Sequence, residues 1–184
     1  MKSKKLKSTA NSKTMLIVIT AMFSAVIAVA TAFIKIPTPL GYSHAGDSMI
    51  YLGASILPAP YGIVCASIGG AIADLISGYP QWAIPTAIIK ALNAVPFIVC
   101  TMILKNSKFK YKIINPPNLL MLIPTTLVTV SGYFVATGLM YSWESAFAEL
   151  ALWWVQPLIG AVIYILAGAG LDAIKFKKKI LSYL

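Results

Sequence analysis

Long apolar stretches separated by short polar segments run through almost the whole chain. The first covers Met15 to Ile34, 20 residues, which is long enough to cross a hydrocarbon core of about 30 Å as a helix. Further apolar stretches follow at about 47–57, 61–76, 82–104, 119–141 and 142–174. The pattern predicts an all-α integral membrane protein with six transmembrane helices. We place its membrane domain at 14–174, between basic tails at 1–13 and 175–184.

Two of these stretches leave alternatives open. The stretch at 47–57 is short for a complete span, and the turn Pro58-Ala59-Pro60 joins it to the next one. The two can instead form a re-entrant hairpin, which requires protein or water around its backbone. The first stretch also resembles a signal peptide, with Ala28-Val29-Ala30 as a cleavage site. It is longer than the apolar part of most signal peptides, so we expect it to be retained.

Composition supports a membrane protein. Hydrophobic residues make up 59% of the 184 residues and charged residues only 11%, whereas soluble domains carry roughly 25% charged residues. The formal net charge is +10, which by itself suggests nucleic-acid binding. All 15 basic residues are lysines, however, and the chain lacks the arginines that grip phosphates and bases with two hydrogen bonds. Soluble, disordered and nucleic-acid-binding classes are therefore excluded.

The lysines also predict the orientation in the membrane. The N-terminal tail holds five, the loop at 105–112 four and the C-terminal tail four, so that 13 of 15 fall on one side if six segments alternate. Lysine-rich loops stay on the cytoplasmic side. Both termini are therefore predicted to be cytoplasmic, and residues 35–46, 77–82 and 141–144 form the outer surface.

Two charged residues lie deep within apolar stretches, Lys90 in the fourth and Glu149 in the sixth. Each costs about 2.5–3.5 kcal/mol at the centre of a membrane helix, so such residues face a cavity or a partner rather than lipid. We expect the two to neutralise each other when the cavity is empty. A purely structural ion pair is the alternative.

Helical spacing extends both residues into polar stripes, and the fifth segment carries a third stripe at spacings of four: Thr129, Tyr133, Thr137 and Tyr141. Lys90 continues to Asn93, and Glu149 continues to Trp153 and Gln156, at spacings of three or four residues. The predicted small-molecule pocket combines these stripes with the fifth segment and the outer loops: Tyr42, His44, Trp82, Lys90, Asn93, Tyr133, Thr137, Glu149, Trp153 and Gln156. Interhelical hydrogen bonds and an aromatic belt at the membrane surface are the structural alternatives. Asp47 and Asp74 are interpreted as structural, with Asp47 capping a helix.

Other chemistry is absent from the sequence. A phosphate-binding Walker A motif, a catalytic triad and a cluster of metal ligands are all missing. We therefore predict no enzyme activity, no ATPase, no metal and no cofactor. Cys65 and Cys100 lie in apolar runs, and we expect two buried free thiols rather than a disulfide.

Small residues form a ridge along the first segment. Ala21, Ala25, Ala28 and Ala32 recur at spacings of four, three and four. Such a ridge allows another helix to approach closely in lipid. Packing within the chain is the alternative to a partner protein.

The middle third of the chain resembles the substrate-binding S components of energy-coupling factor (ECF) vitamin transporters in prokaryotes. The resemblance rests on Gly46-Asp47, the Leu-Pro-Ala-Pro-Tyr-Gly turn, Gly69-Gly70 before Asp74, and the segment from Trp82 to Lys90. It implies a plasma-membrane protein that captures a vitamin or precursor outside the cell and passes it to a transmembrane coupling subunit driven by two ATPases. The C-terminal half is similar only in layout.

The resemblance also suggests roles for residues. The family's Ala-x-x-x-Ala contact with the coupling subunit corresponds to Ala21 and Ala25, and the family's pockets lie where the polar stripes meet. The residues favour a small aromatic ring, with hydroxymethylpyrimidine or a vitamin B6 form preferred. A stand-alone proton-coupled carrier, with Glu149 as the proton site, is the alternative function.

Overall fold

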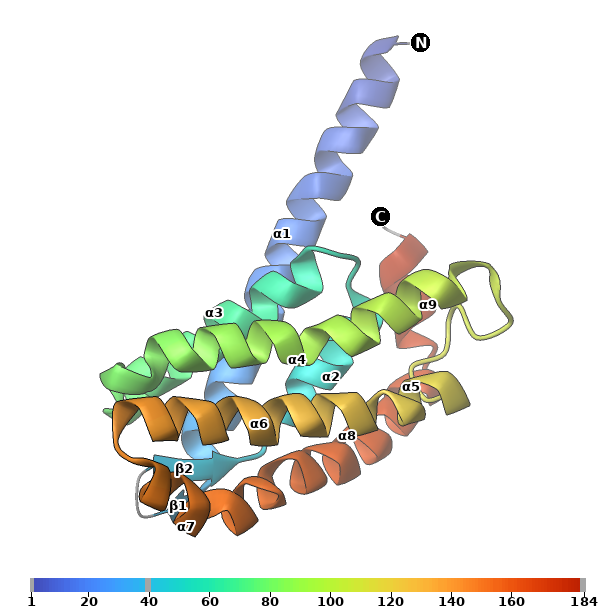
Figure 1. The fold of residues 1–184 in the computed structure, drawn as a ribbon. Coiled ribbons are helices and arrows are strands. Elements are labelled where there is room, and N and C mark those ends of the chain that lie inside the picture. Colours follow the sequence, from blue (N-terminus) through green and yellow to red (C-terminus); the bar gives the residue numbers. More distant parts are fainter. Residues whose placement is uncertain (1, 39–40, 183–184) are drawn as a thin grey trace.

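The computed structural model describes residues 2–38 and 41–182, which are mostly helical (Figure 1). The elements in chain order are α1 (Lys2–Phe33), β1 (Lys35–Thr38), β2 (Gly41–His44), α2 (Gly46–Ile56), α3 (Tyr61–Ser77), η1 (Pro80–Trp82), α4 (Ala83–Ile103), η2 (Leu104–Asn106), α5 (Pro116–Leu120), α6 (Leu122–Met140), α7 (Trp143–Trp153), α8 (Val155–Ala173) and α9 (Phe176–Ser182).

Four helical stretches in the described part of the chain are long and apolar enough to cross a membrane: Ser12–Phe33, Pro80–Asn106, Pro116–Met140 and Trp143–Ala173. The remaining two of the six expected segments are shorter. Helix α3 has 17 residues, and α2 has 11, which corresponds to only about 17 Å at the helical rise. The structure thus supports a helical membrane protein with four spanning candidates and two shorter apolar helices.

Helix α2 occupies the centre of the molecule. It contacts α1, α3, α4 and α8, and every residue from Gly46 to Ile56 except Met49 is buried. Close approach at Gly160 of α8 makes this enclosure tight, because a Cβ there would lie 3.0 Å from the Cβ of Asp47. A helix too short to span is thereby protected from lipid on all sides, as irregular membrane segments require.

Residues 35–38 and 41–44, which were expected to lie in a loop, form the two strands of a β-hairpin, so the all-α expectation was incomplete. Strands β1 and β2 pair in antiparallel register, with Lys35 opposite His44 and Pro37 opposite Tyr42. Pro37 cannot continue a helix because its ring removes the backbone donor. Strand β2 contacts α1 and α8, which holds its side chains over one end of the bundle.

The sixth expected segment, 142–174, is divided into two helices. Helix α7 ends at Trp153 and α8 begins at Val155. Pro157 explains the break, because it supplies no amide hydrogen for the carbonyl of Trp153. At the other end of α7, the Ser142 hydroxyl caps the helix by accepting from the Ser145 amide at 3.2 Å.

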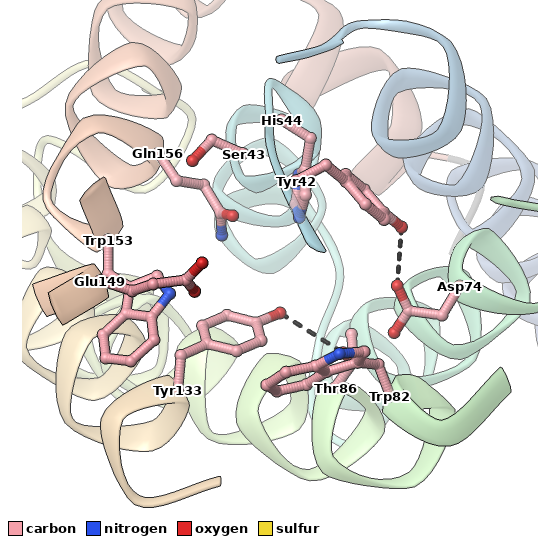
Figure 2. A pocket seen from close by; sticks show the side chains of 10 residues that line it. All are labelled: Tyr42, Ser43, His44, Asp74, Trp82, Thr86, Tyr133, Glu149, Trp153 and Gln156. Atoms are coloured by element: carbon pink, nitrogen blue, oxygen red, sulfur yellow. Dashed lines mark hydrogen bonds between the residues drawn. The ribbon is translucent and has the colours of Figure 1, made fainter. Parts of the chain in front are cut away.

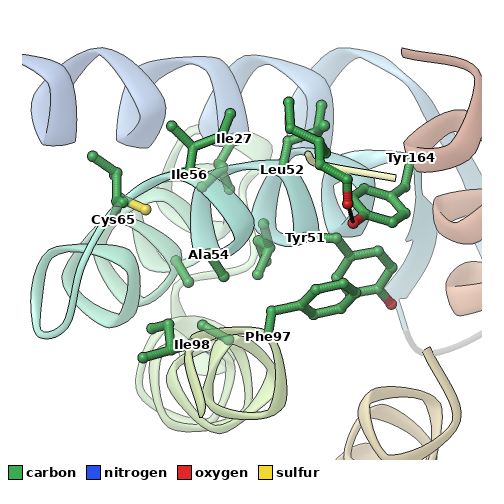
Figure 3. Close-up of a cluster of buried hydrophobic side chains, with 14 of the residues drawn as sticks. Ile27, Tyr51, Leu52, Ala54, Ile56, Cys65, Phe97, Ile98 and Tyr164 are labelled. Carbon is green, nitrogen blue, oxygen red and sulfur yellow. Dashed lines mark hydrogen bonds between the residues drawn. The ribbon is translucent and has the colours of Figure 1, made fainter. Parts of the chain in front are cut away.

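Aromatic rings from α2, α4 and α8 fill the middle of the core (Figure 3). The Tyr51 ring stacks on Phe97 with centroids 5.2 Å apart, and Tyr164 meets Phe97 edge-on, also at 5.2 Å. The Tyr164 hydroxyl donates to the carbonyl of Ile113 at 3.0 Å. Cys65 and Cys100 are both buried and free, as expected.

The two ends of the bundle differ in composition. Figure 1 shows the hairpin and α7 at one end, and α5 and α9 at the other. The lysine-rich segment at 105–112 lies at the α5–α9 end, where Lys178 of α9 stands 5.9 Å from the ring centroid of Tyr111. Asp172 of α8 fixes the end of this segment, since its carboxylate accepts from the amides of Ile113 and Ile114 at 2.8 and 2.9 Å.

Candidate functional site

A cavity lies at the hairpin end of the bundle, where strand β2 meets the ends of several helices (Figure 2). The empty space among its side chains amounts to about 450 Å³, including the part that is open to solvent. It is lined by Tyr42, Ser43 and His44 of β2, Asp74 of α3, Trp82 of η1, Thr86 of α4, Tyr133 of α6, Glu149 and Trp153 of α7, and Gln156 of α8.

One wall pairs the hairpin with α3. The Tyr42 hydroxyl donates to Asp74 Oδ1 at 2.6 Å, and burial next to this carboxylate raises the pKa of Tyr42, so the phenol stays protonated. The Tyr42 ring also lies 5.3 Å from the ring of Tyr79, and Lys35 Nζ stands 4.8 Å above its centroid. These contacts hold the hairpin over the cavity.

The opposite wall is formed by α7 and α6. Figure 2 shows the Glu149 carboxylate pointing into the cavity from the side opposite Asp74. Trp153 and Glu149 are only 9% and 5% exposed. The Tyr133 ring lies 5.8 Å from Trp82, and the Tyr133 hydroxyl is 3.4 Å from Thr86 Oγ1. Trp82, Tyr133 and Trp153 therefore give the cavity three aromatic surfaces on which a flat ring can stack.

A buried ionic cluster lies next to the cavity. Lys90 Nζ donates to Asp47 Oδ1 at 2.5 Å, and Gln156 Nε2 donates to Asp47 Oδ2 at 2.9 Å. The Lys90 and Asp47 side chains are 1% and 0% exposed. Lys90 Nζ also stands 5.1 Å from the centroid of Tyr133. Both oxygens of Asp47 are thus occupied, and the cluster ties α2 to α4 and α8.

This cluster corrects two expectations. The ion-pair partner of Lys90 is Asp47, where we expected Glu149. Asp47 is also not a helix cap: the N-cap of α2 is Ala45, which makes no side-chain hydrogen bond. The reason is the enclosure of α2, which brings the first turn of this helix against α4 and α8.

Three of the predicted site residues do not line the cavity. Lys90 is engaged by Asp47, and Asn93 Nδ2 donates to Thr129 Oγ1 at 3.0 Å, forming an interhelical bond between α4 and α6. Thr137 is fully buried, and its hydroxyl has no hydrogen-bond partner among the described residues. A step of four residues moves about 6 Å along a helix, so Tyr133 is the one member of the stripe on the fifth segment among the described residues that line the cavity.

The other seven predicted residues do line it: Tyr42, His44, Trp82, Tyr133, Glu149, Trp153 and Gln156. Sequence reasoning missed Ser43 and Thr86 as lining residues and gave Asp74 only a structural role. Thr86 precedes Lys90 by four residues on the same helix face, a signal that was available. Ser43 carries no such signal.

His44 is a buried, neutral residue in this setting. Its Nδ1 accepts from the Gly46 amide at 3.1 Å, and burial together with nearby Lys90 lowers the pKa of His44 to about 3. Within the described residues, no group of three or more His, Cys, Asp or Glu side chains is placed to hold a metal ion.

The fold and the cavity define a helical membrane protein of the class that binds small molecules. Comparison with known proteins agrees: residues 11–173 match the family described as the ECF-type riboflavin transporter, S component. A protein of Pyrococcus woesei, named "Uncharacterized protein in gap 3'region", is 32% identical over 156 residues, covering 84% of this chain and 96% of that protein.

The chain therefore belongs to the ECF-type riboflavin transporter S component family. It is a vitamin-type substrate-binding membrane subunit of ECF transporters, and the family is one of transporter subunits rather than enzymes. Membership implies association with the coupling and ATPase components of an ECF module. The resemblance noted at residues 46–92 is thus confirmed, and the match extends it over most of the chain.

Proposed function

We propose that the cavity captures a small, water-soluble vitamin or vitamin precursor from outside a prokaryotic cell, as the first step of ATP-driven import across the plasma membrane. The observation that carries this proposal is the composition of the cavity. Aromatic surfaces from three different elements surround two carboxylates at the end of the bundle away from the lysine-rich segments. Because lysine-rich ends are cytoplasmic, the cavity end faces outward and both termini are cytoplasmic. In this proposal, α2 and α3 complete the six membrane segments.

The lining of the cavity favours a planar heteroaromatic ligand. Trp82, Tyr133 and Trp153 supply ring faces, while Glu149 and Gln156 supply hydrogen-bonding groups. Hydroxymethylpyrimidine and vitamin B6 forms fit this set of groups, and the family's description adds riboflavin as a candidate.

Binding is tested by titrating the purified chain with these three ligands and following tryptophan fluorescence, since two tryptophans line the cavity. Tyr133→Ala and Trp153→Ala should each weaken binding of the active ligand by at least about tenfold, because each removes a stacking surface. Tyr111→Ala, at an exposed tyrosine of the opposite end, is the matched control and should leave Kd unchanged. Unaltered binding in both cavity variants would show that the cavity is not the site.

Coupling to the energising module is proposed to use α1. Its alanine ridge is divided in the structure: Ala28 and Ala32 are buried at 4% and 7% exposure, whereas Ala21 and Ala25 are exposed. The buried pair packs within the chain, and the exposed pair remains accessible to a second helix.

The double variant Ala21→Leu/Ala25→Leu should abolish uptake and copurification with the coupling subunit while leaving ligand binding intact. Val26→Leu adds bulk at an exposed position on a neighbouring part of α1. This control should leave uptake, copurification and ligand binding unchanged. Lost binding would mean that the ridge is internal packing. Uptake by the chain alone, in liposomes without an ATPase, would instead support the proton-coupled carrier with Glu149 as the proton site.

A further inference from the structure

We infer that the cavity selects neutral or positively charged heteroaromatic molecules that carry hydrogen-bond donors, such as amino-substituted rings, and rejects anionic forms of the same rings, such as phosphate esters and carboxylates. This inference rests on the proposed function and narrows its ligand to one chemical class.

The charge of the lining is the first observation. Asp74 and Glu149 contribute carboxylates from opposite sides of the cavity (Figure 2), and the described residues that line it include neither lysine nor arginine. His44 supplies no positive charge either, because burial keeps its ring neutral at physiological pH. An anionic ligand would therefore be placed between two like charges, which repel it.

Two lysines lie near the cavity, and each already contacts another group. Lys90 is bound by Asp47, so this pair adds no net charge beside the cavity. Lys35 is an exposed residue of β1 whose ammonium group lies over the ring of Tyr42. Neither lysine therefore presents its ammonium group to a ligand inside the cavity.

Unpartnered polar atoms give the second, independent observation. Asp74 Oδ2 is buried and has no hydrogen-bond partner among the described residues. The indole Nε1 of Trp82 is likewise buried and unpartnered within the described chain. Buried polar atoms without partners are uncommon, and here they call for a ligand donor at Asp74 and a ligand acceptor at Trp82. An amino group attached to a nitrogen heterocycle offers both.

The test compares ligands that share a ring and differ in charge. The purified full-length chain is titrated with pyridoxamine, pyridoxine and 4-pyridoxate, with 4-amino-5-hydroxymethyl-2-methylpyrimidine and its phosphate ester, and with riboflavin and riboflavin 5′-phosphate. In each series that binds, the neutral or amine-bearing member should bind at least about tenfold more tightly than the anionic member. An anionic member that binds equally well or better overturns the inference and leaves the proposed function intact.

Failure of all three series to bind would also overturn the inference, because together they represent the class it names. The proposed function would still stand if the same preparation copurified with a coupling subunit and ATPases. Loss of both binding and copurification would reject the two together.

Two variants remove one charge each and keep the shape of the side chain. Asp74→Asn and Glu149→Gln should each weaken binding of the amine-bearing ligand by about tenfold. Each should also reduce the factor by which the protein binds this ligand more tightly than the carboxylate-bearing ligand. The amide oxygen that Asp74→Asn introduces can still accept from Tyr42, so the wall is retained. Glu144→Gln removes the same charge from an exposed position in the first turn of α7 and should leave the preference unchanged. An unaltered preference in both cavity variants would contradict the inference.

Discussion

The Lys90–Asp47 pair allows a quantitative test of how the bundle is held together. Replacing Lys90 by methionine keeps most of the length of the side chain but leaves the Asp47 carboxylate with Gln156 as its remaining side-chain hydrogen-bond donor among the described residues. Both members of the pair are at most 1% exposed, so water cannot compensate the unpaired charge. Breaking a buried pair from one side costs about 3–5 kcal/mol, and we expect Lys90→Met to destabilise the protein by that amount.

The double variant Lys90→Met/Asp47→Asn should recover much of this loss. It removes both charges together, and the amide oxygen introduced by Asp47→Asn can still accept from Gln156. Replacement of a complete buried pair by neutral groups is often neutral or stabilising. The double-mutant cycle should therefore give a coupling energy of at least about 2 kcal/mol.

Thermal unfolding in one detergent, followed by circular dichroism, measures these changes. At about 2–4 °C per kcal/mol for a chain of this size, Lys90→Met should lower Tm by about 6 °C or more. Lys105→Met, at an exposed lysine, controls for the loss of charge and should change Tm little. If the stability losses of the two single variants simply add, so that the double variant is the least stable of all, the reasoning is refuted.

Three further predictions concern other parts of the structure. Gly69→Ala should destabilise the α1–α3 contact by about 1–3 kcal/mol in thermal unfolding, because its Cβ would lie 2.7 Å from that of Ile27, whereas Gly170→Ala has open space and should be neutral or slightly stabilising. Because the pKa of His44 falls from 6.5 when unfolded to about 3 when folded, the stability it contributes is present above pH 6.5 and is lost progressively below it. Lowering the pH from 7.5 to 5.5 should therefore cost about 1.4 kcal/mol, and this loss should disappear in His44→Asn. Asp172→Asn weakens the acceptor of two backbone amides, so it should lower the free energy of unfolding by about 1–3 kcal/mol. It should also speed tryptic cleavage at 105–112, and an unchanged cleavage rate would contradict this prediction.

Much of the architecture could be predicted because membrane burial leaves a strong pattern in the sequence. The long apolar stretches correspond to α1, α4, α6 and the α7–α8 pair. The family resemblance, which rested on residues 46–92, is confirmed by a match over 11–173. These features depend on composition over many residues, and a single local contact does not change them.

The hairpin and the break between α7 and α8 depend on fewer residues. Pro37 and Pro157 each remove one backbone hydrogen-bond donor, and both residues can be read directly from the sequence. The first lies in a segment that we expected to be a loop, and the second lies in one that we expected to be a continuous helix. The hairpin gives Tyr42 a fixed position over Asp74, and the break lets α7 turn Glu149 and Trp153 toward the cavity (Figure 2).

Side-chain partners were the least predictable part, as Asp47 illustrates. An acidic residue in the first turn of a helix normally stabilises the helix dipole, and the sequence offers no reason to expect more. Only the three-dimensional enclosure of α2 brings this carboxylate to Lys90 and Gln156. The contact of Asp74 with Tyr42 could not be predicted for the same reason, because the two residues lie 32 positions apart in the chain.

The partner of Lys90 also changes what the cavity is expected to bind. Had Lys90 paired with Glu149, the site would have contained a cation and an anion that a ligand of either charge could displace. With Lys90 neutralised by Asp47, the charges that line the cavity are the carboxylates of Asp74 and Glu149. The selectivity of the site therefore follows from a contact outside its lining. Weakening that contact by Asp47→Asn should free the Lys90 ammonium and improve the relative binding of anionic ligands.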